Sequence, residues 1–297
     1  MKKNKIGAFL ACALLATGVS ACSGATDPGA APQASDKTIT FVASPGYDNI
    51  VSLNALWEQL LAEHGYTFKT TQVDIAAGFA GIARGDLDGY IETWLPSTHG
   101  TYVDKYKDQL QITEKPFYDN DRLVLVAPKS VPENTISEVV KNAEKYGNKI
   151  VGIEAGSGEM KILPEVVKKY GATDKLKIIE GSTPATLAAL KDAAAKGEPL
   201  IATLWEPHWA FASMPIKVIQ DDLGAWPKPD QSHTVFSKKF AAKEPQVVKW
   251  MTNMKLTDDQ FASLMSAVRE TPDNPGAGAK KWLEDPENRK TADSWFS

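Results

Sequence analysis

Residues 176–205 read LKIIEGSTPATLAALKDAAAKGEPLIATLW, and this stretch decides the class of fold. Short apolar runs at 176–180 and 199–205 have the length of β-strands, whereas residues 184–197 carry apolar side chains at helical spacing. A strand, a helix and a second strand in this order form the repeating unit of α/β proteins. The sequence therefore predicts an α/β fold.

The same alternation forms two series along the chain. The first has strand-like runs at 38–43, 67–73, 88–94 and 122–128, with an apolar helical pattern from Leu53 to Gly65 and a small-residue segment at 75–85. The second opens where Thr135 and Glu138 have capping-box spacing and continues through 149–153, 160–171 and the stretch above. Two such series predict two lobes around mainly parallel sheets.

Near residues 233–237 the pattern changes to helices only, including 257–270, where Thr257 and Gln260 again have capping-box spacing. We expect these helices to pack back onto the first lobe. Lobe I would then comprise residues 37–127 and 233–297, and lobe II residues 128–232. The chain would cross between the lobes around 125–130 and 229–236, leaving a cleft that closes by hinge motion.

The N-terminus predicts export. Three lysines within the first five residues precede the apolar run 6–19, which is too short to span a bilayer comfortably. Val19-Ser20-Ala21-Cys22 resembles the lipobox of bacterial lipoproteins, so we expect residues 1–21 to be a signal peptide and Cys22 the site of lipid attachment. An ordinary secretory signal is the alternative. Since no cysteine follows Cys22, the mature chain forms no internal disulfide.

Residues 22–36 are rich in Ser, Gly, Ala and Pro and predict a flexible tether. Loss of the three lysines with residues 1–21 moves the formal net charge from −4 to −7. A net-acidic exported chain is a poor binder of nucleic acid, and we expect no nucleic-acid partner and a monomer.

No catalytic or metal-binding motif is present. The four histidines, at positions 64, 99, 208 and 233, form no HExxH motif or other close ligand pair, and no GxSxG motif or complete P-loop occurs. We therefore expect no metal and no cofactor. A hydrolase assembled from distant Ser, His and Asp residues remains an alternative without specific support.

Two of the eight tryptophans occupy unusual positions. Trp94 and Trp205 each end a predicted strand, and each is followed within two residues by a proline, Pro96 or Pro207. Ligands of α/β proteins collect outside the carboxyl ends of strands, so the two rings could face one another across a cleft. The alternative is that both cap the core, as we expect of Trp57, Trp250 and Trp282 in their helical patterns.

The segment VGIEAGSGEM (151–160) reads as a strand, a glycine-rich turn and the start of a helix. Gly156 and Gly158 would let the backbone approach a ligand, and free N–H groups at a helix start can bind an anion. Many such turns have no ligand, so this motif alone leaves both readings open.

Taken together, GIEAGSGEM, WEPHW and WLPSTH behind a lipobox resemble the glycine betaine and proline betaine binding proteins of ABC importers. The resemblance covers nearly all of the mature chain. It implies a two-lobed periplasmic-binding-protein-like fold of type II, with the ligand in the cleft between lobes. It also implies an aromatic cage for a quaternary ammonium, a polar site for a carboxylate, and a permease and its ATPase subunit as partners at the extracytoplasmic face of the membrane.

The resemblance carries over to individual residues. Trp94 and Trp205 match two cage tryptophans, and His99 matches a histidine that contacts the ligand carboxylate. Gly158 and Glu159 match a pair whose backbone N–H groups hold the same carboxylate, which requires the Glu159 side chain to point away from it.

The third cage aromatic falls on Tyr47, where relatives carry tryptophan. Because tyrosine offers a smaller face with a polar edge, ligand choice could differ. The family function is capture of glycine betaine; a receptor for choline, carnitine or another quaternary amine is the alternative, as is a sensor that signals through a partner.

Overall fold

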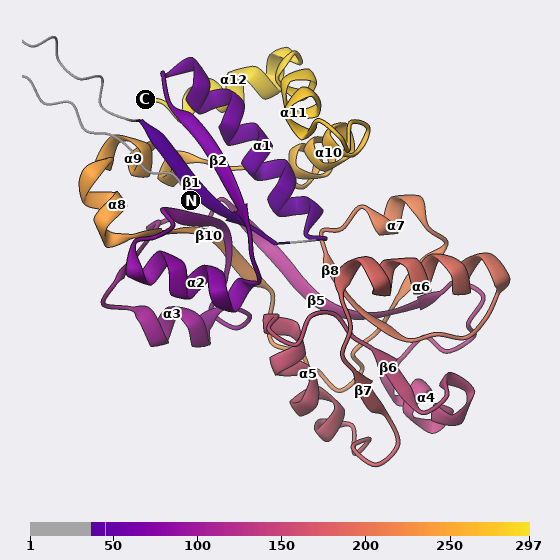
Figure 1. The fold of residues 1–297 in the computed structure, drawn as a ribbon. Helices are drawn as coiled ribbons and strands as arrows, with labels where there is room; N and C mark the ends of the chain where they lie inside the picture. Colours follow the sequence, from indigo (N-terminus) through magenta and orange to yellow (C-terminus); the bar gives the residue numbers. More distant parts are fainter. Residues whose placement is uncertain (1–36, 45) are drawn as a thin grey trace, which may run out of the picture. The chain divides into compact units, whose positions relative to one another are not determined.

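The computed structural model describes residues 37–44 and 46–297. The predicted signal peptide, Cys22 and the tether lie outside these described residues. Figure 1 shows an α/β arrangement in which strands alternate with helices before a run of helices at the C-terminus. The α/β class predicted from the sequence is confirmed.

Three strands at the N-terminal end pair in parallel. β1 (Thr38–Ala43) lies between β2 (Thr67–Gln72) and β3 (Gly89–Leu95). The connecting helices are α1 (Asp48–Glu63) and α2 (Ile75–Arg84). The apolar stripe predicted for α1 is buried, and α2 ends at a glycine in the left-handed conformation, Gly85, with φ of 77°.

A second parallel group forms from the stretch that decided the fold class. β6 (Lys149–Val151) lies between β7 (Lys177–Ile179) and β8 (Ala202–Glu206). The connecting helices are α5 (Gly158–Lys169) and α6 (Thr183–Lys196). Both helices begin at a serine whose side chain accepts a backbone N–H, which fixes where each helix starts.

Two long strands join these groups and pair with each other in the antiparallel sense: β5 (Tyr118–Pro128) and β10 (Asp230–Ser237). Among the described residues ten strands form one sheet, in the order β2-β1-β3-β10-β5-β8-β6-β7, with β4 (Leu110–Ile112) beside β10 and β9 (Ile216–Ile219) beside β5. The expectation of mainly parallel sheets is therefore wrong for the middle of the sheet, where β5 and β10 run against their neighbours.

The helices of the C-terminal region pack against the first parallel group. Figure 1 shows α10, α11 and α12 beside α1, and the Trp57 and Trp295 rings stack there with centroids 5.8 Å apart. The predicted capping box of Thr257 and Gln260 opens α10. The bounds are α8 (Lys238–Lys243), α9 (Pro245–Asn253), α10 (Asp258–Arg269), α11 (Pro275–Leu283) and α12 (Pro286–Ser294).

The buried apolar side chains form two separate cores. The first core draws on residues 39–118 and 235–295, and the second on residues 124–219 together with Trp94. The chain thus passes between the cores twice, along β5 and along β10. Trp94 is an exception in sequence order, because it extends from β3 into the second core. Tyr47 packs against both.

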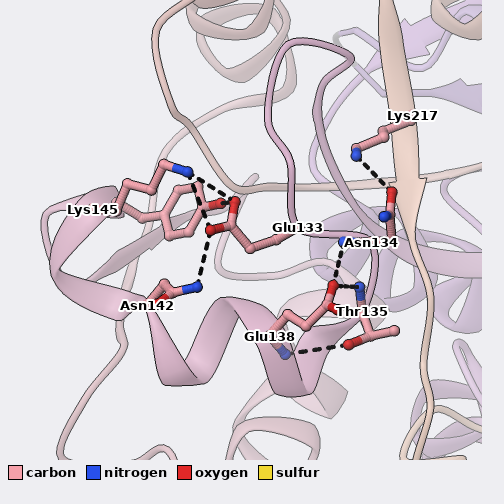
Figure 2. A network of polar contacts seen from close by, with 8 residues as sticks. Glu133, Asn134, Thr135, Glu138, Asn142, Lys145 and Lys217 are labelled. Carbon is pink, nitrogen blue, oxygen red and sulfur yellow. Dashed lines mark hydrogen bonds and ion pairs between the residues drawn. The ribbon is translucent and has the colours of Figure 1, made fainter.

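Short elements complete the second core. They are α4 (Ile136–Lys141), the 3₁₀-helix η1 (Ala143–Tyr146) and α7 (Ala210–Ser213); α3 (Gly100–Tyr106) belongs to the first. At the start of α4 the predicted capping box is present: the Glu138 N–H donates to Thr135 Oγ1 over 3.2 Å, and the Glu138 carboxylate accepts from the Thr135 N–H (Figure 2).

Glu133 forms the centre of the neighbouring network in Figure 2. Its buried carboxylate accepts from Asn142 Nδ2 at 3.0 Å, from Lys145 Nζ at 3.1 Å and from the Tyr146 hydroxyl. Because donors from α4's end and η1 already satisfy this carboxylate, the network fixes the local structure of the second core.

Candidate ligand-binding site

One cavity brings together all six site residues expected from the sequence. Tyr47, Trp94, His99, Gly158, Glu159 and Trp205 line it. The first three belong to segments around β1 and β3, and the others to α5 and β8. The space open to the centre of a water molecule is about 30 Å³, enough for a few waters. A larger ligand requires the walls to move apart.

One face of β3 supplies a wall of the cavity. Successive strand residues point to opposite faces, so Tyr90, Glu92 and Trp94 lie on one side, and all three line the cavity. Residues 91 and 93 are buried on the other side. The wall therefore consists of two aromatic rings with a carboxyl group between them.

His99 closes the turn that follows β3. Its N–H donates to the Trp94 carbonyl at 2.9 Å, and its Nδ1 accepts from the Trp94 N–H at 2.8 Å. Burial, with a smaller effect of Lys161, lowers the pKa of His99 to about 3, so the imidazole is neutral near pH 7. Since Nδ1 is an acceptor, Nε2 carries the proton and is available as a donor.

The side chain of Asp230 on β10 holds the same turn in place through hydrogen bonds. Its carboxylate accepts from the Ser97 N–H at 2.7 Å and from the Thr98 N–H at 2.9 Å, and the Thr98 hydroxyl also donates to it. The role of Asp230 could not be predicted from the sequence, because Asp230 lies more than 130 residues from the turn and no local signal connects the two.

Tyr47 and Trp205 meet face to face. Their ring centroids are 5.1 Å apart with an angle of 18° between the ring planes. Burial raises the pKa of Tyr47, and Glu154, which accepts from the Thr183 N–H at 2.7 Å, raises it further. The Tyr47 side chain thus reaches from the start of α1 to the second core.

The side chains that follow Trp205 in WEPHW (205–209) lie outside the cavity lining. Glu206 pairs with Arg122 at 3.0 Å, and His208 places its ring edge-on against Trp205 at 4.9 Å. Trp209 lies under Arg269, whose guanidinium is 3.2 Å from the ring centroid. The His208 contact supports the Trp205 ring, and the Arg269 contact assigns Trp209 to packing outside the cavity.

The start of α5 approaches the turn of His99 closely. The Ser157 hydroxyl caps the helix by accepting the Met160 N–H at 3.2 Å. The first two N–H groups of the helix, those of Gly158 and Glu159, do not take part in this cap. A Cβ atom on Gly158 would collide with the Thr98 carbonyl oxygen. Glycine is therefore required where the two cores come closest beside the cavity.

Two carboxyl side chains of the cavity lining are buried. Glu92 is 1% exposed and Glu159 2%. Burial raises the pKa of both, that of Glu92 to about 8. The Leu204 backbone opposes the rise for Glu159, yet neither of its carboxyl oxygens has a hydrogen-bond partner of ordinary geometry among the described residues. The sequence analysis left the Glu92 carboxyl out, although strand alternation with Trp94 could have placed it.

Two kinds of site were not found in the part of the chain that the structure describes. It contains no cluster of three or more His, Cys, Asp or Glu side chains that could hold a metal ion. Over the same residues no helix is long and apolar enough to cross a membrane.

The chain belongs to the family of substrate-binding domains of ABC-type glycine betaine transport systems, whose family model matches residues 37–285. These are binding proteins and not enzymes. The glycine betaine/carnitine transport binding protein GbuC of Listeria monocytogenes is 28% identical over 142 residues, 48% of this chain and 47% of that protein. The match thus spans about half the length of that relative.

Solved structures share the fold. Lactococcal OpuAC, in a closed form with glycine betaine, has a TM-score of 0.79 at 27% identity, with 88% of this chain and all of that chain covered. ProX from Borrelia burgdorferi has a TM-score of 0.79 at 22% identity, covering 87% and 96%. A choline binding protein in complex with choline has a TM-score of 0.76 at 18% identity, covering 88% and 92%. The two-lobed fold is thereby confirmed.

Replacement of Gly158 by alanine tests the close approach at the cavity. We expect Gly158→Ala to hold the cores apart and to weaken glycine betaine binding by about tenfold to a hundredfold, since overpacking costs about 1–3 kcal/mol. Small-angle scattering should report a larger radius of gyration with ligand than for the unaltered protein.

Gly100→Ala is the matched control, because a Cβ atom there meets nothing within 4 Å. Equal compaction of both variants by ligand would contradict the assigned constraint.

Proposed function

We propose that this chain is the substrate receptor of an ABC importer and captures glycine betaine or a related quaternary ammonium solute. The observation that carries the proposal is the convergence of three aromatic rings, a neutral histidine and a helix start on one cavity. Family membership and the structure of lactococcal OpuAC with glycine betaine support it.

In this proposal Tyr47, Trp94 and Trp205 hold the ammonium group. A trimethylammonium has no N–H to donate and carries a diffuse charge, so aromatic faces are suitable partners, each contributing about 0.5 to 2 kcal/mol. Trp94 and Trp205 are almost wholly buried, and their surroundings exclude water from the charge.

The opposite end of the ligand would be a carboxylate. His99 Nε2–H and the backbone N–H groups of Gly158 and Glu159 supply directional donors for it. Since these groups come from both cores, only the closed arrangement completes the site, and closure reports occupancy to the permease.

The finer assignments rest on the sequence. We propose a signal peptide at 1–21, a lipid on Cys22, a tether at 22–36, and lobes of residues 37–127 with 233–297 and of residues 128–232. A monomer so anchored at the extracytoplasmic face would deliver its ligand to a permease and its ATPase subunit. The separation of the two cores supports the division into lobes.

A receptor for choline is the second candidate. The observation that favours it is the set of ionisable side chains in the cavity: two carboxyl groups that a cation could ionise, Glu92 and Glu159, line it, whereas no lysine or arginine is found among its described lining residues. Such a lining suits a ligand with net positive charge.

Loss of a cage ring should abolish most binding. We expect Trp205→Ala and Trp94→Ala each to weaken binding of quaternary ammonium ligands at least about tenfold, because each removes a cation–π contact and leaves the cavity open to water. Isothermal titration with glycine betaine, proline betaine, carnitine and choline provides the measurement, with circular dichroism to check folding.

Trp226→Ala is the control, since Trp226 packs on the second core outside the cavity. If none of the four ligands binds the unaltered protein, the proposed function is wrong.

His99 should distinguish ligands by their polar end. We expect His99→Ala to weaken glycine betaine more than choline, because only glycine betaine presents a carboxylate to Nε2–H. Competition titrations on the same protein sample measure how many fold each ligand loses in affinity. Equal losses for glycine betaine and choline would refute the assigned role.

A further inference from the structure

We propose that Glu92 is a specificity-determining residue that supplies a titratable negative charge behind the aromatic cage, favouring a fixed cation such as choline over a zwitterion such as glycine betaine. The inference rests on the proposed function of the cavity and names which ligand class it selects.

The position of Glu92 carries the argument. It lies on the cavity face of β3 between Tyr90 and Trp94, and its Oε2 accepts a hydrogen bond from Asn49 Nδ2. Its Oε1 is buried and has no hydrogen-bond partner of ordinary geometry among the described residues, although the Trp94 side chain, like Asn49, acts to lower the Glu92 pKa. Asp121 Oδ1 shares this state, but Glu92 is the one of the two carboxyl groups that lines the cavity, where a bound ligand could reach it.

No lysine or arginine is paired with Glu92 inside the described cavity lining. Lys161 lies outside it, 3.5 Å above the Tyr102 ring. An ionised carboxylate in such a place is costly without a counter-ion, and the free protein therefore keeps Glu92 protonated up to about pH 8. A quaternary ammonium held by Trp94 would bring the missing positive charge and favour loss of this proton.

Several other titratable groups surround Glu92. Its neighbours are Tyr90 on its own strand, Tyr47 at the start of α1, Asp121 on β5 with Asp230 beyond it on β10, Glu159 on α5, and His99 after β3. Both tyrosines have raised pKa values, and that of His99 is lowered to about 3. None of these three side chains therefore titrates between pH 6 and pH 8.

Two of these neighbours could compete with Glu92. Burial raises the pKa of Asp121 and of Glu159 as well. Asp121 is outside the cavity lining; its Oδ2 accepts from the Ser232 hydroxyl at 2.6 Å, while its Oδ1 has no partner among the described residues. Glu159 lines the cavity on the α5 side. The experiment has to separate these carboxyl groups.

The sign of the pH dependence follows from linkage. A cation that binds the ionised form of Glu92 releases a proton below the free pKa of about 8, so its affinity rises with pH and levels off above it. Release of one proton corresponds to about a tenfold gain per pH unit. A zwitterion also brings a carboxylate, whose repulsion opposes the gain, and its affinity should change much less.

The test measures dissociation constants of choline and glycine betaine for the full chain between pH 6 and pH 9. We expect the choline affinity to rise by about tenfold between pH 6.5 and pH 7.5 and the glycine betaine affinity to stay nearly flat. Calorimetry in buffers of different ionisation enthalpy should show proton release with choline, a result that needs no variant.

Glu92→Gln should remove the rise for choline and reduce its advantage over glycine betaine. Glu206→Gln is the matched control, because Glu206 is paired with Arg122 outside the cavity and should keep the choline profile. The variants Glu159→Gln and Asp121→Asn, whatever they do to the affinity itself, should keep the rise of choline affinity with pH.

The outcomes separate the two levels of the proposal. Absence of binding by either ligand overturns the proposed function. Binding with no proton release and no slope for choline overturns the role of Glu92, as does a slope that survives Glu92→Gln but disappears in Glu159→Gln or Asp121→Asn.

Discussion

The antiparallel pairing of β5 with β10 is the constraint on which the cavity depends. These strands carry the chain between the two cores, and Asp121 on one lies opposite Asp230 on the other. Asp230 holds the turn of His99, while Asp121 lies close enough to Glu92 for the Glu92 carboxyl to raise the Asp121 pKa. A shift of one residue in this pairing would turn the side chains of one strand to the other face of the sheet and so separate the two carboxyl groups. The two strands that connect the cores therefore also position the residues around the cavity.

Aromatic rings and a buried carboxyl group contribute to cation binding in different ways. Rings attract a cation without the desolvation cost of an ionised carboxylate, but each contributes little, and any quaternary ammonium satisfies them. A carboxyl that stays neutral in the free protein avoids that cost until a cation arrives. Because Glu92 lies between Tyr90 and Trp94 on one face of β3, the strand holds the carboxyl group and the aromatic rings at a fixed spacing.

The sequence allowed prediction of features whose causes are local. The helix of α1, the capping boxes at Thr135 and Thr257, and the strand ends at Trp94 and Trp205 follow from periodicity and from short spacings. The β10 strand, by contrast, did not follow: its pairing with β5 joins residues more than 100 positions apart, and HTVFS alone shows little of a strand's alternation. The antiparallel centre of the sheet was mispredicted for the same reason.

In the candidate site, too, only features with a local cause could be predicted from the sequence. The family resemblance named the six residues, but only coordinates place them around one cavity and reveal the partners that orient them. The dependence of the turn at Ser97 and Thr98 on Asp230 has no signal in the sequence. Glu92 did have one, since the alternation in GYIETW puts it beside Trp94.

Tyr47 shows why selectivity has to come from the polar groups. In this closed arrangement its ring already stacks on Trp205, and the cavity of about 30 Å³ is too small for a trimethylammonium group. A ligand must therefore exchange part of an aromatic stack, worth about 0.5–1.5 kcal/mol, for cation–π contacts of about 0.5–2 kcal/mol each. One stack is lost while several cation–π contacts form, so the exchange favours binding, but every quaternary ammonium ligand gains these contacts alike. What remains to discriminate among ligands is the charge and hydrogen bonding around the rings, namely His99, the α5 start and the carboxyl of Glu92.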